Sequence, residues 1–213
     1  GLAREGGAGG LPTWVDGTET YGVGLGRSVG MLDEQLGIVA ATRLANEGRL
    51  DREGLRECVR LVASGLMVLT GIAKPQRWTE LKPDAFIDVL DVARQIASVV
   101  VVDITSCIEQ DEELFFDTMA PRRNGLTITT LALADHVLLV AAADPVGLQR
   151  AVRLMLALPD ELPGVHADVV VNRLRKASLP GGSKRDQVVQ TFTRHLGRTR
   201  PRGGVWGGRP SRF

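Results

Sequence analysis

The sequence lacks long hydrophobic runs, and none comes close to the roughly 18 uninterrupted apolar residues of a membrane span. Its N-terminus also has no basic segment that leads into an apolar one. A secretory signal needs both of those segments in that order. These absences argue against a membrane-spanning helix and against secretion, so we expect a cytoplasmic protein.

Cysteine and histidine are also scarce. Cys58 and Cys107 lie far apart, without the close pairing of a zinc knuckle or a redox motif. The histidines, His136, His166 and His195, form neither a His-Glu-x-x-His motif nor a cluster with cysteine. We therefore expect two reduced thiols and no bound transition metal.

Acidic residues are nearly absent from the last part of the chain. Residues 173–213 contain 11 Lys and Arg but a single acid, Asp186, whereas residues 1–172 contain 15 Lys and Arg against 24 Asp and Glu. The two parts therefore carry charges of +10 and −9. A polycationic segment can bind phosphate backbones by releasing counterions, without reading sequence. A solvated, disordered end is the simpler interpretation.

The remaining composition is that of a globular chain. With 213 residues, 44% of them hydrophobic and 24% charged, the protein can bury a substantial core. Residues 1–10 are rich in glycine and predict a flexible end. We expect an α/β domain over residues 11–197 and a basic, disordered tail over residues 198–213, which are rich in glycine, arginine and proline.

Short apolar runs alternate with amphipathic segments along the body of the chain. Four successive valines at 99–102 predict a central parallel strand that is buried on both faces. The alternation as a whole predicts an α/β fold with a mostly parallel sheet and helices on both faces. Strands are expected at 11–16, 66–70, 99–103, 137–141 and 169–172, and helices at 38–46, from 51, from 83, at 126–134 and at 145–159.

Three polar residues end strands of this sheet: Asp16, Asp103 and Asn172. Ligands of open α/β sheets bind outside the carboxyl ends of the strands, so these are the candidate site residues. An aspartate that ends a buried strand can orient Mg²⁺, or water bound to it, beside a phosphate chain. The alternative is that Asp103 caps a loop by accepting backbone hydrogen bonds and that Asn172 closes an Asx-turn.

Several segments, in order over residues 14–176, resemble the ParA/MinD family of deviant Walker A ATPases, and within it the CpaE/TadZ-like branch of pilus-assembly and partitioning proteins. The most characteristic are Val-Val-Val-Val-Asp at 99–103, Ala-Asp-Pro at 143–145 and Val-Val-Val-Asn-Arg at 169–173. Similar segments lie at 44–51, 69–71, 77–78, 111–114, 117–124 and 134–137. This resemblance implies an incomplete P-loop NTPase-like fold.

The resemblance also implies roles for matching residues. Asp103 falls at the switch aspartate that acts through the magnesium shell. Asp16 falls at the first acid of an Asp-x-Asp element, whose second acid helps to position the attacking water in the family. The second acid has no direct match, because Glu19 is displaced by one residue. Asn172 and Arg173 match the Asn-Arg pair at the adenine edge, where an amide can both donate and accept hydrogen bonds.

One departure from the family concerns the phosphate cradle, Lys-Gly-Gly-x-Gly-Lys-Thr. No Gly-Lys dipeptide occurs in the chain, and the glycines at 6–10 are followed by Leu11 and Pro12 instead of a lysine and a Ser or Thr. A strand, a phosphate loop and a helix also need about 25 residues, whereas only ten precede Leu11. We therefore expect the N-terminal P-loop unit to be missing.

The first functional hypothesis is a truncated or degenerate ParA/MinD-type ATPase domain with weak or no ATP hydrolysis. Its intact relatives use ATP and Mg²⁺ to join two protomers and localise pilus, secretion or partitioning machinery. The alternative is a non-catalytic scaffold whose basic tail contacts nucleic acid or a protein partner. A Rossmann-type enzyme ranks last, because the glycines at 22, 24 and 26 do not fit Gly-x-Gly-x-x-Gly.

Overall fold

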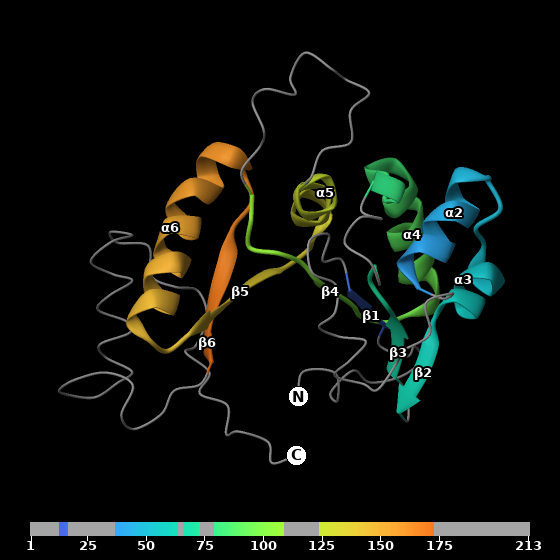
Figure 1. Ribbon diagram of the computed structural model, residues 1–213, viewed down its shortest axis with the longest axis horizontal. Coiled ribbons are helices and arrows are strands. Elements are labelled where there is room, and N and C mark those ends of the chain that lie inside the picture. Colours follow the sequence, from blue (N-terminus) through green and yellow to red (C-terminus); the bar gives the residue numbers. More distant parts are fainter. Residues whose placement is uncertain (1–12, 17–36, 64–65, 73–78, 109–123, 173–213) are drawn as a thin grey trace. The chain divides into compact units, whose positions relative to one another are not determined.

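The computed structural model describes residues 13–16, 37–63, 66–72, 79–108 and 124–172, the first range through its backbone only (Figure 1). The predicted ends, 1–10 and 198–213, lie outside the described residues. The strands are β1 (Thr13–Asp16), β2 (Arg60–Ala63), β3 (Leu66–Leu69), β4 (Val100–Asp103), β5 (Val137–Ala142) and β6 (Ala167–Asn172). The helices are α2 (Ile38–Asn46), α3 (Arg52–Cys58), α4 (Pro83–Ile96), α5 (Gly125–Leu133) and α6 (Pro145–Glu161).

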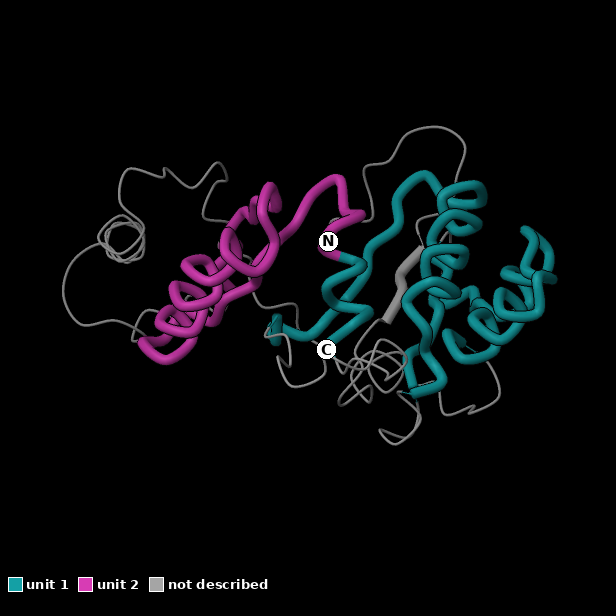
Figure 2. Tube along the Cα trace, turned by 90° about the horizontal axis from the view of Figure 1, so that it is seen from above, with its two compact units in different colours: residues 1–130 teal, residues 131–213 magenta. Residues whose placement is uncertain are grey.

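The chain divides into two compact units, Gly1–Thr130 and Leu131–Phe213 (Figure 2). The first unit holds a four-stranded sheet in the order β2-β3-β1-β4. Strand β1 pairs in parallel with β3 on one side and with β4 on the other. The expectation of an α/β fold with a mainly parallel sheet is therefore confirmed.

Strand β2 is the antiparallel exception, and it is not among the strands expected from the sequence. It pairs with β3, and the register shifts between Leu61 and Ala63. This strand has only four residues and directly follows α3, so its sequence shows no period of its own. Its pairing with β3 defines it more than its composition does.

The helices of the first unit begin where the sequence predicts. Asp51 caps α3, since its Oδ1 accepts a hydrogen bond from the Gly54 N–H at 2.7 Å. Pro83 opens α4, where its missing N–H costs no helical hydrogen bond. Helix α4 packs against α2 and α3 and buries Phe86, Val89 and Leu90. These contacts form the core around which the first sheet is held.

The prediction that the valine strand is buried on both faces was wrong. Val99 and Val101 are 48% and 40% exposed, and burial alternates along β4. Strand β4 is the last strand in the described order, so no described strand covers its outer side. A run of valines indicates that a strand can be buried on both faces, but actual burial depends on the elements that pack beside it.

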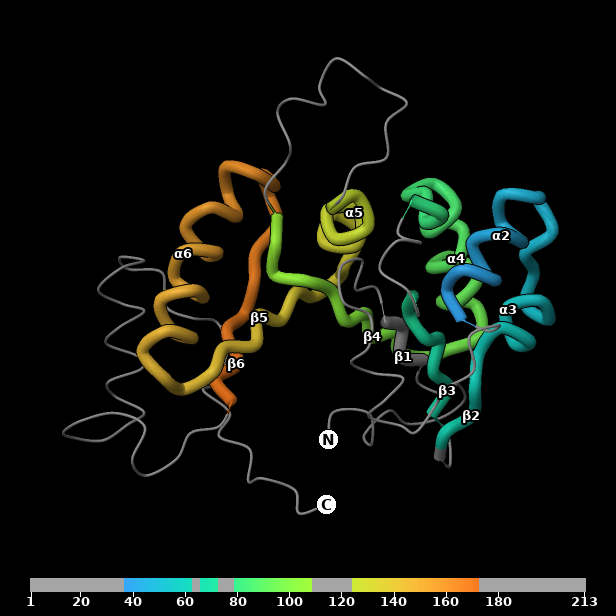
Figure 3. Tube along the Cα trace, in the orientation of Figure 1, coloured from blue at the N-terminus to red at the C-terminus, as the bar shows by residue number. Residues whose placement is uncertain are grey.

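The second unit contains a β5-α6-β6 crossover (Figure 3). Strands β5 and β6 pair in parallel over six residues, from Val137 with Ala167 to Ala142 with Asn172. Asp144 caps α6 by accepting from the Gly147 N–H at 2.9 Å, as predicted. Helix α6 runs through Pro159 to Glu161, slightly beyond the predicted end. The hydrophobic core of this unit consists of Ala141, Ala143, Leu148, Ala151, Val152, Val169 and Val171.

No helix within the described ranges is both long enough and apolar enough to cross a membrane.

Gly37 fixes the junction between α2 and β3. Its φ of 110° favours glycine, and a Cβ at this position would lie 2.5 Å from the carbonyl oxygen of Thr70 and closer still to the Thr70 Oγ1. The next residue, Ile38, donates its N–H to the same carbonyl at 2.8 Å. The start of α2 is therefore packed directly against the end of β3.

We expect Gly37→Ala to lower the free energy of unfolding by about 2–4 kcal/mol, because it combines left-handed strain with a backbone clash. Gly48→Ala is the matched control: Gly48 also has positive φ, at 65°, but a Cβ added there would have no atom within 4 Å. The control should lose only about 1–2 kcal/mol. Urea denaturation measures both variants, and equal losses would contradict the close packing at Gly37.

Candidate functional site

The candidate site begins with two aspartates that end neighbouring strands. Strands β1 and β4 run parallel, and their register pairs Val15 with Val102 and Asp16 with Asp103. Paired residues of adjacent strands have backbones about 4.8 Å apart. The sequence placed both aspartates at strand ends, and the structure brings these ends together at one edge of the first sheet (Figure 1).

The same edge includes Thr70, which is not among the site residues expected from the sequence. Strand β3 pairs with β1 so that Val15 lies opposite Leu69, which places Thr70 one residue beyond this pair. Thr70 accepts the first backbone hydrogen bond of α2 through its carbonyl oxygen. A glycine directly before a helix was the available signal, because Gly37 permits this approach.

Asn172 lies in the second unit. It ends β6, pairs in register with Ala142 and is exposed. Its carbonyl oxygen accepts from the Ala143 N–H at 3.0 Å. Arg173, Glu19 and the glycines at 6–10 and 22–26 lie outside the described residues. The described geometry therefore joins Asp16 with Asp103 and places Asn172 at the end of a separate sheet.

Mg²⁺ usually keeps several waters and binds one or two carboxylates together with substrate phosphates. Asp103 is exposed and so open to solvent at the strand end. Within the described ranges, no three His, Cys, Asp or Glu side chains gather into a complete metal site. The Asp103 carboxylate is one ligand of the kind that such a water-rich ion takes.

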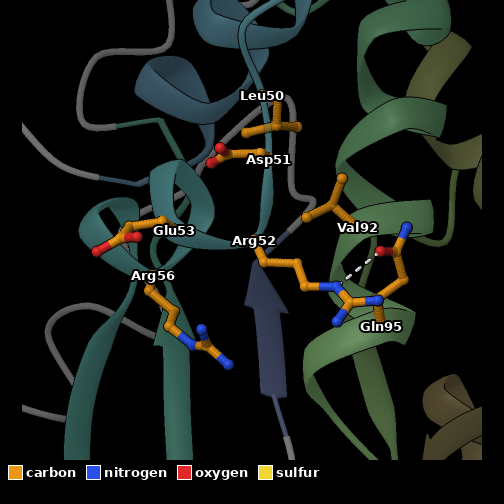
Figure 4. Close-up of a pocket in the computed structure, with 7 residues that line it drawn as sticks. All are labelled: Leu50, Asp51, Arg52, Glu53, Arg56, Val92 and Gln95. Atoms are coloured by element: carbon orange, nitrogen blue, oxygen red, sulfur yellow. Dashed lines mark hydrogen bonds between the residues drawn. The ribbon is translucent and has the colours of Figure 1, made fainter.

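An open groove lies elsewhere, between α3 and α4 (Figure 4). Its volume is about 510 Å³, and Arg52 Nε donates to Gln95 Oε1 across it at 3.0 Å. It is lined by Leu50, Asp51, Arg52, Glu53, Arg56, Val92 and Gln95. None of the predicted site residues is among them, so the groove does not enlarge the candidate site.

Comparisons with known proteins identify the fold. No protein-family profile and no curated protein sequence matches the chain. Solved structures do match. One is a ParA family ATPase from Chlorobium tepidum TLS, with a TM-score of 0.66 and 17% sequence identity. The match covers 90% of this chain and 70% of the ATPase chain. The chain has a ParA/MinD-like fold.

Two further structures agree with this fold. The septum site-determining protein MinD from Pyrococcus horikoshii OT3, complexed with Mg-ADP, gives a TM-score of 0.59 at 13% identity, over 85% of this chain and 65% of its own. A putative plasmid partition protein from Borrelia burgdorferi B31, bound to AMPPNP, gives 0.59 at 9% identity, over 97% of this chain and 73% of its own. The chain thus spans less than two thirds of the length of this MinD, and slightly more than two thirds of the length of the other two proteins.

The two cysteines of the ParA/MinD-like chain differ in their surroundings. Cys58 is buried, and its pKa is raised by that burial and, to a smaller extent, by the nearby Glu57 carboxylate. Cys107 is exposed four residues beyond Asp103, and its Sγ accepts from Asn124 Nδ2 at 3.3 Å. Thiols react as thiolates, so a raised pKa and burial both slow the reaction of Cys58.

We expect Ellman's reagent at pH 7.5 to modify Cys107 at least ten times faster than Cys58. In the folded chain Cys58 should react slowly. After urea unfolds the chain, both thiols should react at the same rate. Cys107→Ser should remove the fast phase and leave the slow one. A fast phase that persists in this variant would place Cys58 at the surface and contradict the described core.

Proposed function

We propose that this chain is a degenerate nucleotide-switch domain of the ParA/MinD type, with weak or no ATP hydrolysis. The observation that carries the proposal is the register that brings Asp16 and Asp103 to the same carboxyl edge of a parallel sheet. The ParA/MinD-like fold supports it, since two similar structures contain Mg-ADP and AMPPNP.

The two aspartates of this edge have distinct roles in the proposal. Asp103 orients water in the shell of a magnesium ion, which when bound would neutralise phosphate charge. Asp16 holds the neighbouring position, from which it can orient a second water. Asn172 and Arg173 belong to the second unit, and the proposal gives them, by resemblance to the family, the recognition of an adenine edge, because a side-chain amide both donates and accepts hydrogen bonds.

Weak activity follows from what residues 1–213 lack. Phosphate groups are usually held by glycine backbone amides, a lysine and a hydroxyl, and no Gly-Lys dipeptide is present. A charge-assisted hydrogen bond contributes about 1.5–3 kcal/mol, so its absence weakens binding by roughly tenfold to more than a hundredfold. The displaced Glu19 further weakens the positioning of an attacking water.

In the cell, the domain would help to localise pilus, secretion or partitioning machinery. Two of the similar structures are named for septum site determination and plasmid partition. We include in the proposal a homodimer, a protein partner from such a system, and contact of the basic tail with nucleic acid. The charge of +10 over residues 173–213, which include the basic tail, supports the contact with nucleic acid.

Titration of a fluorescent ATP analogue tests the proposal. We expect a dissociation constant no tighter than about 100 µM, binding that requires Mg²⁺, and no detectable binding by Asp103→Ala. Asp88→Ala is the matched control, because Asp88 is an exposed acid on α4 of the same unit and its loss changes the net charge equally.

Two outcomes would contradict this account. Low-micromolar binding would show that the site is not degenerate, and equal binding by the two variants would remove Asp103 from the site. A chain that binds no nucleotide in any form would favour the alternative function, a non-catalytic scaffold that acts through its basic tail.

A further inference from the structure

The groove between α3 and α4 has the size of a small-molecule site. Its volume of about 510 Å³ lies within the range of ligand pockets, roughly 300–1,000 Å³. Both helices belong to the first unit, and they pack against each other. Neither Asp16 nor Asp103 lines the groove, so a ligand held there is separate from the nucleotide of the proposed function.

Two arginines of α3 line this groove. Arg52 and Arg56 are four residues apart on the helix, so their side chains leave the same face of it. Both are exposed, and within the described residues no carboxylate lies within ion-pair distance of either guanidinium. Like charges at this spacing repel each other, and an anion bound by both guanidinium groups removes that repulsion.

Gln95 on α4 holds one of these arginines in the groove. Arg52 Nε donates to Gln95 Oε1 at 3.0 Å (Figure 4). This bond uses only Nε, so both Nη groups of Arg52 remain as donors for an oxyanion. Because Gln95 presents its oxygen to the arginine, its Nε2 is a further donor. The groove therefore offers two guanidinium groups and one amide as hydrogen-bond donors.

The acidic residues of the lining are turned to other uses or other directions. Asp51 Oδ1 accepts from the Gly54 N–H at 2.7 Å, so this carboxylate caps α3. Figure 4 shows the Glu53 carboxylate pointing away from α4. Leu50 and Val92 also line the groove and are half-buried, which adds an apolar surface beside the cationic donors.

We propose that this groove binds a small organic phosphate monoester. Such a group has three terminal oxygens and about two negative charges at neutral pH, so it can accept from both guanidinium groups and the amide together. A carboxylate has only two oxygens and one charge. The organic part of the ester lies on Leu50 and Val92 and removes apolar surface from water. Binding needs no metal ion, because Arg52 and Arg56 supply the neutralising charge.

Titration of the full chain with phenyl phosphate in EDTA, followed by NMR of the backbone amides, tests the proposal. We expect saturable shifts at residues 50–56 and 92–95, with a dissociation constant of about 1 mM, as befits so small a ligand. Arg52→Gln and Arg56→Gln should each weaken binding by at least about fivefold. Arg43→Gln is the matched control, because Arg43 is an exposed arginine on α2 of the same unit, and it should leave the affinity unchanged.

Two further ligands test the chemistry of the groove. Inorganic phosphate should bind at least about fivefold more weakly than phenyl phosphate, because it has no apolar group to cover Leu50 and Val92. Benzoate should also bind at least about fivefold more weakly, because it has one charge and two oxygens. Equal affinity for inorganic phosphate would show that charge alone holds the anion, and equal affinity for benzoate would assign the groove to carboxylates. Either result would overturn the proposal.

Asp103→Ala separates this groove from the proposed nucleotide site. The variant should bind phenyl phosphate with unchanged affinity, although we expect it to lose the Mg²⁺-dependent binding of the ATP analogue. Loss of phenyl phosphate binding in Asp103→Ala would place the phosphate at the aspartate edge and overturn the proposal. Circular dichroism checks that every variant remains folded. Absence of saturable shifts, or equal binding by Arg56→Gln and the unchanged chain, would also show that the groove is not a phosphate site.

Discussion

The parallel pairing of β1 with β4 is the constraint on which the candidate site depends. Residues 13–16 and 100–103 are distant in sequence, and four residue pairs hold them in register. Because the strands run in the same direction, their terminal aspartates meet at one edge. A shift of one residue would separate them and turn each side chain to the other face of its strand.

The surrounding packing holds this register. Strand β3 flanks β1 on its other side, and the start of α2 is bonded to Thr70 just beyond β3. Helix α4 packs against α2 and leads into β4 through Ala97, which caps the helix. The site edge is therefore supported by a helical core whose largest fully buried side chain is Phe86.

Local patterns in the sequence predicted the elements well. The caps at Asp51 and Asp144 and the valine strand ending at Asp103 all follow from short-range chemistry. Pairing was harder to predict, since β2 is defined by its distant partner β3 and the exposure of Val101 depends on which strands lie beside β4. Likewise, Asp16 and Asp103 could be named as strand ends, but the approach of Gly37 to Thr70 required the structure.

Disulfide formation across β1 and β4 tests the central claim most directly. The chain with Cys58→Ala and Cys107→Ser would carry Asp103→Cys together with either Asp16→Cys or Thr13→Cys. Disulfides need Cα atoms within about 7 Å, which the parallel register gives only to the Asp16 pair. Rapid oxidation of the Asp16 pair alone is the predicted result. Preferential oxidation of the Thr13 pair, which an antiparallel ladder would bring together, would contradict the account.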